Sequence, residues 1–222
     1  MDGRDCAFEV FVTNLGKYNE GFLIGEWVKF PVTDEEMQKV FQRIGINAVY
    51  EEWFITDYDV SDPAIYDLLG EYESLSELNY LAHRIMEMQE SEMFWQAVLE
   101  LGESTGSVQD LINLTENMDC YDFLQGVNSD YDLGYYWIEE SGCYDTSQLG
   151  HLSSYIDFES FGRDVRFVES GMFTDHGYVR SNGGRFVDIY NGTIEDIPQE
   201  YRITSPNLYR ARTAPNRADV VR

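Results

Sequence analysis

Carboxylates are the side chains in this sequence that are most able to do chemistry. Two carboxylates at a suitable separation hydrolyse glycosidic bonds, and clusters of carboxylates bind hard cations such as Ca²⁺. Close pairs are present at Glu51-Glu52, at Asp57 with Asp59, and at Glu139-Glu140. However, residues 44–162 include 25 acidic side chains, so close pairs arise there by chance. The pairs alone therefore do not identify a catalytic site, and a carboxylate enzyme ranks below non-enzymatic functions.

The other reactive side chains form no recognisable catalytic or metal-binding constellation. His83, His151 and His176 are isolated from one another and from the cysteines, and no spacing suits a zinc site. The sequence also lacks a Walker-type phosphate loop, a Gly-x-Ser-x-Gly motif and an EF-hand spacing. We therefore expect a protein that is not an enzyme and that has no catalytic residues, no cofactor and no metal site.

Cysteine usage and hydropathy indicate the compartment. Cys6, Cys120 and Cys143 are odd in number and widely spaced, which is typical of a protein from a reducing environment. No run of about 18 apolar residues is present, and the N-terminus has no basic region followed by an apolar one. We expect a cytoplasmic protein that does not associate with membranes.

The formal net charge of −26 is concentrated in the middle of the chain. Residues 44–162 carry a net charge of −24, because Arg84 is their only basic residue, whereas residues 1–43 carry −3 and residues 163–222 carry +1. Such a block repels itself, and a chain selected only for stability would intersperse basic residues. Solubility or a high-salt habitat is the simplest alternative. That alternative predicts an acidic surface everywhere, and it does not explain why the block is rich in aromatic residues.

The charge of this central block is comparable with that of DNA. Duplex DNA carries one negative charge per roughly 1.7 Å of helix axis, so 24 charges correspond to about 40 Å of duplex. A symmetric dimer would correspond to about twice that length. The charge therefore indicates a partner with a large, basic groove shaped to hold DNA.

The elements that must position these carboxylates begin with a small sheet and one helix. Apolar residues at strand spacing occupy residues 8–12, 22–30 and 49–56. Residues 14–21, which contain two glycines, indicate a loop. Thr33 precedes three acidic residues, which predicts a helix that begins there and runs to Arg43.

The last of these predicted strands carries the first acidic pairs. Read as a strand, it places Trp53 and Ile55 on one face with Glu51 and Asp57 at the ends of that face, while Phe54 points the other way. The apolar centre would anchor the strand while carboxylates project at its ends. A plain core strand with solvated ends is the alternative.

The middle of the chain predicts helices with an acidic outer surface. Asp62-Pro63 begins a short helix, and Ser74 begins a second one with a capping box. A third helix ends at Gly102 and a fourth begins at Ser107. The acidic residues lie mostly off the apolar stripes of these helices, so they remain in solvent.

The next segment mixes helices and strands. Ser129 predicts a helix that reaches Ser141, and its last turn contains Glu139 and Glu140. Acidic residues there oppose the helix dipole at a cost of a few tenths of a kcal/mol each, which indicates a functional role or a solvated helix end. Further elements are predicted at residues 151–161 (helix) and at residues 165–169, 172–174 and 178–180 (strands).

The chain changes character after Arg180. Residues 181–184 form a strong turn signal, and residues 185–190 suit one more strand. From residue 197 onward there are three prolines, and from Arg202 there are five arginines against Asp219 alone. This composition predicts an extended or mobile basic tail, which could lie on the protein's own acidic surface.

Several blocks of residues resemble the ArdA family of antirestriction proteins. The blocks are Leu15 to Gly21 with Gly25 to Val28, Tyr50 to Asp59, Asp130 to Gly142, Tyr155 to Phe158, Phe161 to Asp164, and Phe173 to Gly177. Residues 130–142 resemble the antirestriction motif of that family. The resemblance covers about residues 7–180, and several independent blocks in the same order make it specific. Residues after about 180 depart from the family pattern, so the resemblance implies no role for them.

The resemblance implies an α+β fold and an elongated chain of three small domains. The boundaries that we expect are 1–61 (a small antiparallel sheet with a helix), 62–105 (a helical bundle), 106–180 (an α+β dimerisation domain) and 181–222 (an extension). The family forms homodimers curved like bent B-form DNA, is carried by plasmids and conjugative transposons, and inhibits Type I restriction–modification enzymes.

In the family, carboxylates stand in for DNA phosphates. The residues that we expect in this role are Glu51, Glu52, Asp57, Asp59, Asp62, Asp67, Glu71, Glu73, Glu77, Glu87, Glu100, Asp130, Asp132, Glu139 and Glu140. The resemblance places the dimer contact at Tyr135, Tyr136, Trp137 and Ile138. The expected partner is the DNA-binding groove of a Type I enzyme, not nucleic acid itself. The alternative is a general acidic module that binds another basic DNA-binding protein.

Overall fold

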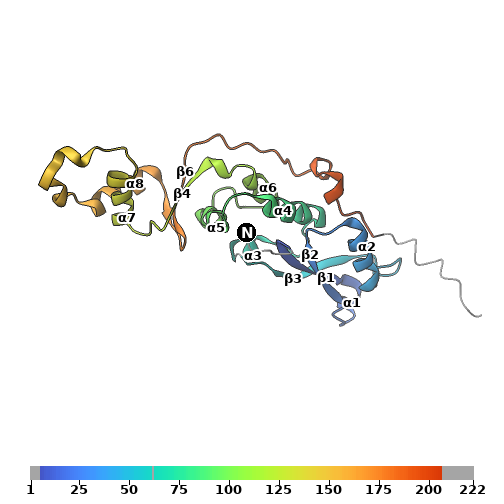
Figure 1. Cartoon of the computed structure of the whole chain (residues 1–222). Coiled ribbons are helices and arrows are strands. Elements are labelled where there is room, and N and C mark those ends of the chain that lie inside the picture. The colour runs from blue at the N-terminus through green and yellow to red at the C-terminus, as the bar shows by residue number, and fades with distance from the viewer. Residues whose placement is uncertain (1–5, 62, 207–222) are drawn as a thin grey trace, which may run out of the picture. The chain divides into compact units, whose positions relative to one another are not determined.

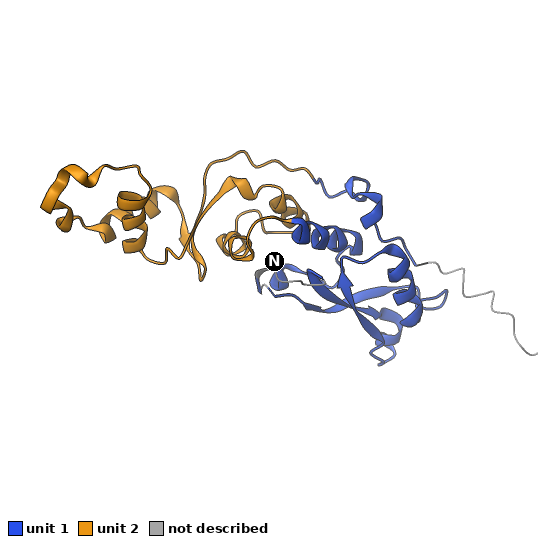
Figure 2. Cartoon of the chain, viewed as in Figure 1, with its two compact units in different colours: residues 1–87, 190–222 blue, residues 88–189 orange. Residues whose placement is uncertain are grey.

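The structure, a computed structural model, describes residues 6–61 and 63–206. The chain forms two compact units, which Figure 2 colours separately: residues 1–87 with 190–222, and residues 88–189. Each unit contains one three-stranded antiparallel sheet together with helices, so the predicted α+β class is confirmed. The division into three domains stays a prediction.

The sheet of the first unit has β1 (Phe8–Asn14) between β2 (Gly25–Phe30) and β3 (Trp53–Asp59), as Figure 1 shows. Phe8, Val10 and Val12 alternate with more exposed residues and point into the core, as their spacing predicted. The loop predicted after β1 is wrong. The Asn14 side chain accepts a hydrogen bond from the amide of Lys17 and thereby caps a short helix, α1 (Leu15–Asn19).

The other two strands are shorter than predicted or shifted. β2 begins at Gly25 because the chain still turns before it: the amide of Phe22 bonds to the carbonyl of Lys17, and Phe22 is exposed. β3 begins only at Trp53, and Val49 lies in solvent. The predicted strands over residues 22–30 and 49–56 are therefore each wrong by several residues at one or both ends.

The first unit has helices at the three places where the sequence predicted them. They are α2 (Asp34–Arg43), α3 (Pro63–Leu68) and α4 (Leu75–Glu87). The Thr33 hydroxyl accepts from the amide of Glu36, and Met37, Val40 and Phe41 are buried. The Ser74 hydroxyl accepts a hydrogen bond from the amide of Glu77, so the serine half of the predicted capping box of α4 is formed.

The second unit contains the helices α5 (Glu92–Leu101) and α6 (Val108–Thr115), the 3-10 helix η1 (Met118–Cys120), and the strands β4 (Tyr121–Gln125), β5 (Met172–Phe173) and β6 (Gly177–Ser181). β6 lies between β4 and β5. Gly102 has a φ of 76° and ends α5 in the left-handed conformation, as predicted. β4 was not predicted, because its five residues lack a clear alternation.

A pair of helices completes the second unit. α7 (Asp130–Tyr135) is capped by Ser129 and continues without a break into a π-helical segment, η2 (Tyr136–Glu140), so the predicted helix from Ser129 to Ser141 is confirmed. η3 (Thr146–Tyr155) consists of two 3-10 helices separated by a kink at Gly150, and α8 spans Phe158–Glu169. The helix predicted at 151–161 and the strand predicted at 165–169 are therefore wrong. Asp157 caps α8 by accepting from the amide of Ser160, which moves the start of the helix past residue 155.

The backbones of α7 and α8 approach each other at two glycines. A Cβ atom placed on Gly134 would lie 1.9 Å from the carbonyl oxygen of Phe158, and one placed on Gly162 would lie 1.8 Å from that of Asp130. The guanidinium of Arg166 then joins the helices by bonding both carboxylate oxygens of Asp130, with its Nε 2.8 Å from Oδ1. Because Gly134 and Gly162 have no side chain, α7 and α8 come close enough for the charge-assisted bond between Arg166 and Asp130 to form beside the point where the helices cross.

The chain after β6 does not behave as predicted. Residues 185–190 form no strand, and residues 190–206 pack against the first unit with two short 3-10 helices, η4 (Ile194–Asp196) and η5 (Gln199–Tyr201). Ile197 is completely buried and Ile203 nearly so. Of the two alternatives predicted for the tail, extended or mobile, the described residues fit the first: residues 202–206 form no helix or strand and lie on the first unit, where the amide of Thr204 bonds to Asp34. Residues 207–222 lie outside the described residues.

We expect Gly134→Ala and Gly162→Ala to lower the free energy of unfolding by roughly 1–3 kcal/mol or more, because each added methyl group forces the two helix backbones apart. Helix propensity alone predicts the opposite sign, a gain of about 1 kcal/mol. Urea denaturation followed by tryptophan fluorescence distinguishes the two. Gly106→Ala is the matched control, since its Cβ meets only a side-chain oxygen of Asp110 at 3.3 Å. If Gly134→Ala and Gly162→Ala both left the free energy of unfolding unchanged, this result would contradict the close approach of the two helices.

We expect the Asp130–Arg166 pair to contribute to stability in a pH-dependent way. The hydrogen bond from Arg166 holds the pKa of Asp130 below the ordinary aspartate value of 3.8. A carboxylate with a lowered folded-state pKa stabilises the fold above its unfolded pKa, and this contribution, about 1 kcal/mol for a partly exposed pair, disappears as the pH falls through the folded-state value. Asp130→Asn should flatten the acid limb of stability measured against pH. Asp164→Asn, which changes an exposed carboxylate on α8, should leave the acid limb unchanged. If the two variants changed the acid limb equally, the pair would have no special role in stability.

Candidate partner-binding surface

Most of the carboxylates that were predicted to contact a partner are exposed and unpaired. Within residues 6–61 and 63–206, none of the nine forms an ion pair with a lysine or arginine. They are Glu51, Glu52, Asp57, Asp59, Asp67, Glu71, Glu100, Glu139 and Glu140. Asp62, also predicted, lies outside the described residues.

A bulge in β3 decides which way two of these carboxylates point. Ile55 pairs with Val12 and Asp57 pairs with Phe11, so Thr56 is the extra residue between them. Asp57 therefore lies on the face opposite Ile55, not on the same face as predicted. Asp59 follows on that outer face as well, away from the core.

The outer face of this sheet brings like charges together. Asp59 lies directly opposite Glu9 of β1, and Lys29 of β2 lies on the other side of Glu9. Like charges in directly opposed positions destabilise a sheet by some tenths of a kcal/mol. Glu9 was not predicted as a surface carboxylate, and only the strand register, which the sequence does not reveal, places it here.

Exposed tyrosines accompany the carboxylates that follow β3. Asp67 lies in α3, Glu71 follows that helix, and Tyr66 and Tyr72 beside them are both exposed. The ring of Tyr72 stacks on Phe54, with 6.3 Å between ring centres, so the sheet fixes one of these tyrosines. This surface offers hydroxyl donors as well as carboxylate acceptors.

Among the nine, Asp57 accepts from the amide of Tyr58 and Glu139 accepts from the Thr146 hydroxyl. The other five predicted carboxylates have an ion pair or a hydrogen bond that joins them to another part of the fold. Asp130 pairs with Arg166, and Asp132 accepts from the Ser129 hydroxyl at the start of α7. In the first unit the carboxylates of Glu73, Glu77 and Glu87 accept hydrogen bonds from Gly70, Tyr190 and His83 respectively. The structure thus separates carboxylates that stabilise the fold from carboxylates that face solvent, a distinction that the sequence alone does not make.

Basic residues of the first unit neutralise other carboxylates. Arg43 bonds Glu26 and Glu36, Lys39 bonds Glu35, and Lys17 bonds Glu20. These pairs are local to residues 17–43, which lie before the acidic block. The nine exposed carboxylates of the block have no such basic partner, whereas the carboxylates of the N-terminal segment are largely compensated.

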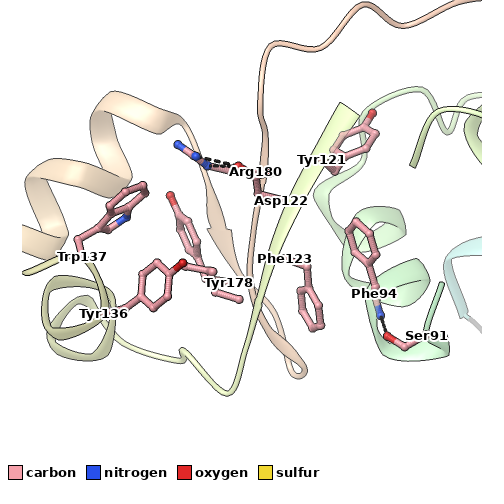
Figure 3. Close-up of a pocket in the computed structure, with 10 residues that line it drawn as sticks. Ser91, Phe94, Tyr121, Asp122, Phe123, Tyr136, Trp137, Tyr178 and Arg180 are labelled. Carbon is pink, nitrogen blue, oxygen red and sulfur yellow. Dashed lines mark hydrogen bonds and ion pairs between the residues drawn. The ribbon is translucent and has the colours of Figure 1, made fainter. Parts of the chain in front are cut away.

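The residues that were predicted to form a dimer contact lie on α7 and η2. Tyr135 is exposed and Ile138 is buried, whereas Tyr136 and Trp137 line a cavity of about 460 Å³ within the second unit. Figure 3 shows these two rings on one side of the cavity and Phe94 of α5 on the other. A cavity of this size is comparable with those that bind small molecules or side chains of a partner.

Polar groups in this cavity belong to an ion-pair network that the sequence did not indicate. Arg180 of β6 pairs with Asp122 of β4 and with Glu169 at the end of α8. The guanidinium lies 5.5 Å from the ring centre of Trp137. The indole Nε1 of Trp137 is buried and has no hydrogen-bond partner among the described residues. An unpaired buried donor costs free energy, so this nitrogen leaves one hydrogen bond unmet inside the second unit.

Two further classes of feature were sought in the described part of the chain. It holds no group of three or more His, Cys, Asp or Glu side chains arranged to bind a metal ion. None of its helices combines the length and the apolar character that a bilayer crossing needs.

Comparison with known proteins identifies the family. No curated protein matches the chain. The family model of the antirestriction protein ArdA matches residues 10–180, which include all but the outermost residues of the two sheets and all nine exposed carboxylates without a basic partner. The match also covers the blocks whose residues resemble that family, and it ends before the segment that packs back onto the first unit. The chain therefore belongs to the ArdA family of antirestriction proteins.

Proposed function

We propose that this antirestriction protein acts as a mimic of DNA, which occupies the DNA-binding groove of Type I restriction–modification enzymes. Membership of the ArdA family makes it an inhibitor of restriction, and the mimicry is the mechanism that its charges support. In this proposal the exposed carboxylates take the places of DNA phosphates. The inhibitor would act in the cytoplasm and protect incoming mobile DNA that carries its gene.

The observation that carries the proposal is the set of nine exposed carboxylates without a basic partner. A groove that binds DNA holds lysines and arginines at the spacing of phosphates, and such groups attract any surface with a similar density of negative charge. A carboxylate that is already paired within its own protein offers little to such a groove. The unpaired carboxylates of β3, the α3 region, α5 and η2 are available for it.

The energetics of such binding are additive and weak at each contact. One exposed ion pair is worth roughly 0–1 kcal/mol, so no single carboxylate should dominate. Many such contacts together give tight binding, which salt weakens strongly because the groove regains its counterions.

Homodimerisation through the region of Tyr135 to Ile138 is part of the proposal. Exposed Tyr135 supports it, since a second chain would cover its ring. A dimer would double the length of acidic surface that is presented to the enzyme.

The direct test is competition with DNA for a purified Type I enzyme. We expect the protein to displace a DNA duplex at low salt and to lose affinity steeply as salt rises, with a linear relation between the logarithms of affinity and salt concentration. Protection of unmodified phage DNA is measured in parallel in cells with and without the gene. Failure to compete at low salt would sink the mimicry proposal, and preferential binding to a different basic DNA-binding protein would favour a general acidic module.

Charge-neutralising variants test the role of the unpaired carboxylates. We expect Glu51→Gln, Glu52→Gln, Asp57→Asn and Asp59→Asn each to weaken inhibition by less than about fivefold, and the quadruple variant to weaken it roughly 10- to 100-fold. The matched control neutralises the paired residues Glu20, Glu26, Glu35 and Glu36, which changes the net charge equally. A single substitution that abolishes inhibition would instead indicate one indispensable carboxylate, as in an enzyme.

A further inference from the structure

We propose that the outer face of the first sheet binds an arginine side chain of the partner protein, which stacks on the rings of Phe11 and Trp27 and donates to the carboxylate of Asp57. These three residues are here called the arginine shelf. The proposal rests on the proposed function for the identity of the partner, and it adds a contact with aromatic rings that the phosphates of DNA do not make.

Strand register places the three residues of the arginine shelf side by side. Phe11 of β1 lies directly opposite Trp27 of β2 on one side and directly opposite Asp57 of β3 on the other. Neighbouring strands are about 4.8 Å apart, so the backbones of Trp27 and Asp57 are separated by roughly 10 Å. A guanidinium above the ring of Phe11 would therefore lie between an indole and a carboxylate.

A glycine on the neighbouring strand makes room for the ring of Phe11. A Cβ atom placed on Gly25 would lie 2.7 Å from Cε1 of Phe11, so a side chain there would displace the ring. The ring of Trp27 meets that of Phe11 edge-on, with 5.2 Å between ring centres and 62° between ring planes. This contact orders both rings before a ligand binds, so less conformational entropy is lost on binding.

The arginine shelf is exposed, although the next aromatic residue on the same face of the sheet is covered. Phe54 is buried, and the rings of Tyr18 and Tyr72 lie 5.0 and 6.3 Å from its own. By contrast, Trp27 keeps 42% of its surface in solvent, and Phe11 is partly exposed. Tryptophan and arginine are both enriched among the residues that contribute most to binding between proteins, which is why an exposed tryptophan here indicates an interface.

The charge around the arginine shelf favours a cationic ligand. The two neighbouring rungs of this face carry three carboxylates and one lysine, namely Glu9, Asp57, Asp59 and Lys29. The amide of Tyr58 donates to one oxygen of Asp57 at 2.9 Å, which orients that carboxylate. A bound cation would relieve the repulsion between the carboxylates of adjacent strands.

Arginine fits this surface better than lysine does. A guanidinium is planar and weakly hydrated, so it can stack on an aromatic ring while its N–H groups bond a carboxylate. An ammonium group is compact and strongly hydrated, so it gains less from the face of a ring. A groove that binds DNA contains both arginines and lysines, and the arginine shelf would distinguish between them where negative charge alone does not.

Short peptides added to the whole protein test the choice of ligand. The probes are two acetylated peptide amides, one with two arginines and one with two lysines, separated by glycine. At about 0.5 M salt, where exposed charges are largely screened, we expect the arginine peptide to shift the indole N–H resonance of Trp27 saturably. The lysine peptide should shift it about fivefold less at the same concentration. Trp27→Phe assigns this resonance, because it removes one of the four indole signals.

Inhibition of a purified Type I enzyme tests whether the arginine shelf is used. We expect Trp27→Leu, which leaves the net charge unchanged, to weaken inhibition roughly 3- to 10-fold, and Trp27→Phe, which keeps a ring, to weaken it less than about twofold. In an Asp57→Asn background, Trp27→Leu should have less than about a twofold effect, because both residues contact the same guanidinium. The matched control is a Glu100→Gln background, in which Trp27→Leu should keep its full effect, since Glu100 is an exposed carboxylate of α5 in the second unit.

Three results would overturn the proposal. The first is an equal shift of the Trp27 indole signal by the two peptides. The second is an effect of Trp27→Leu on inhibition that is absent or that is the same in the Asp57→Asn background. The third is a rise of more than about fivefold in affinity for the arginine peptide when residues 207–222 are deleted, because the arginines of the chain itself would then be the occupant.

Failure of this proposal and failure of mimicry give different results. If the protein displaced DNA from the enzyme but Trp27→Leu had no effect, mimicry by charge would stand and the arginine shelf would not. If the protein did not displace DNA but the arginine peptide still shifted the Trp27 signal selectively, mimicry would be wrong and the arginine shelf would serve a different arginine-bearing partner.

Discussion

Uncompensated negative charge is the constraint on which the rest of this structure depends. Residues 44–162 carry 25 acidic side chains and one arginine, so this block has too few positive charges to offset the repulsion among its carboxylates. Exposed carboxylates can be held near one another only if the chain beneath them is stabilised by other means. In the first unit this support is a β-sheet with an apolar face, and the bulge at Thr56 turns Asp57 and Asp59 away from it. The core and the acidic surface are thus two faces of the same strand.

Two of the arginines of the second unit, Arg166 and Arg180, lie where they join elements of the fold. Arg166 connects α8 to α7, and Arg180 connects β6 to β4 and to the end of α8. Each of these bonds is partly buried, where a charge-assisted hydrogen bond is stronger than in water. As a result these two cations stabilise the fold and neutralise little of the exposed acidic surface.

Local chemistry made some of the fold predictable from sequence. Thr33, Ser107 and Ser129 were predicted as helix starts, and each accepts a hydrogen bond from the amide three residues later. Such caps depend on adjacent residues alone. The family too was identifiable, because its blocks of residues occur in order along the chain.

Features that depend on distant residues could not be predicted. The face of Asp57 depends on a register shift against Phe11 and Val12, and α8 depends on a close approach of Gly162 to the backbone of another helix. Likewise, nothing near Ile197 in the sequence indicates that its side chain is buried, because the segment that contains it packs on α4, which lies more than a hundred residues earlier. For the same reason, the sequence did not show which carboxylates are paired and which are unpaired, because each pair is formed by a tertiary contact.

The return of the chain to the first unit also determines the order in which the protein is completed during synthesis. The second unit is continuous from residue 88 to residue 189, so all of its residues have been made before the first unit has received Tyr190, Ile197 and Ile203. At translation rates of roughly 5–20 residues per second, the N-terminal sheet and α4 wait several seconds for these side chains. The part of the protein that is synthesised first is therefore the part whose core closes last.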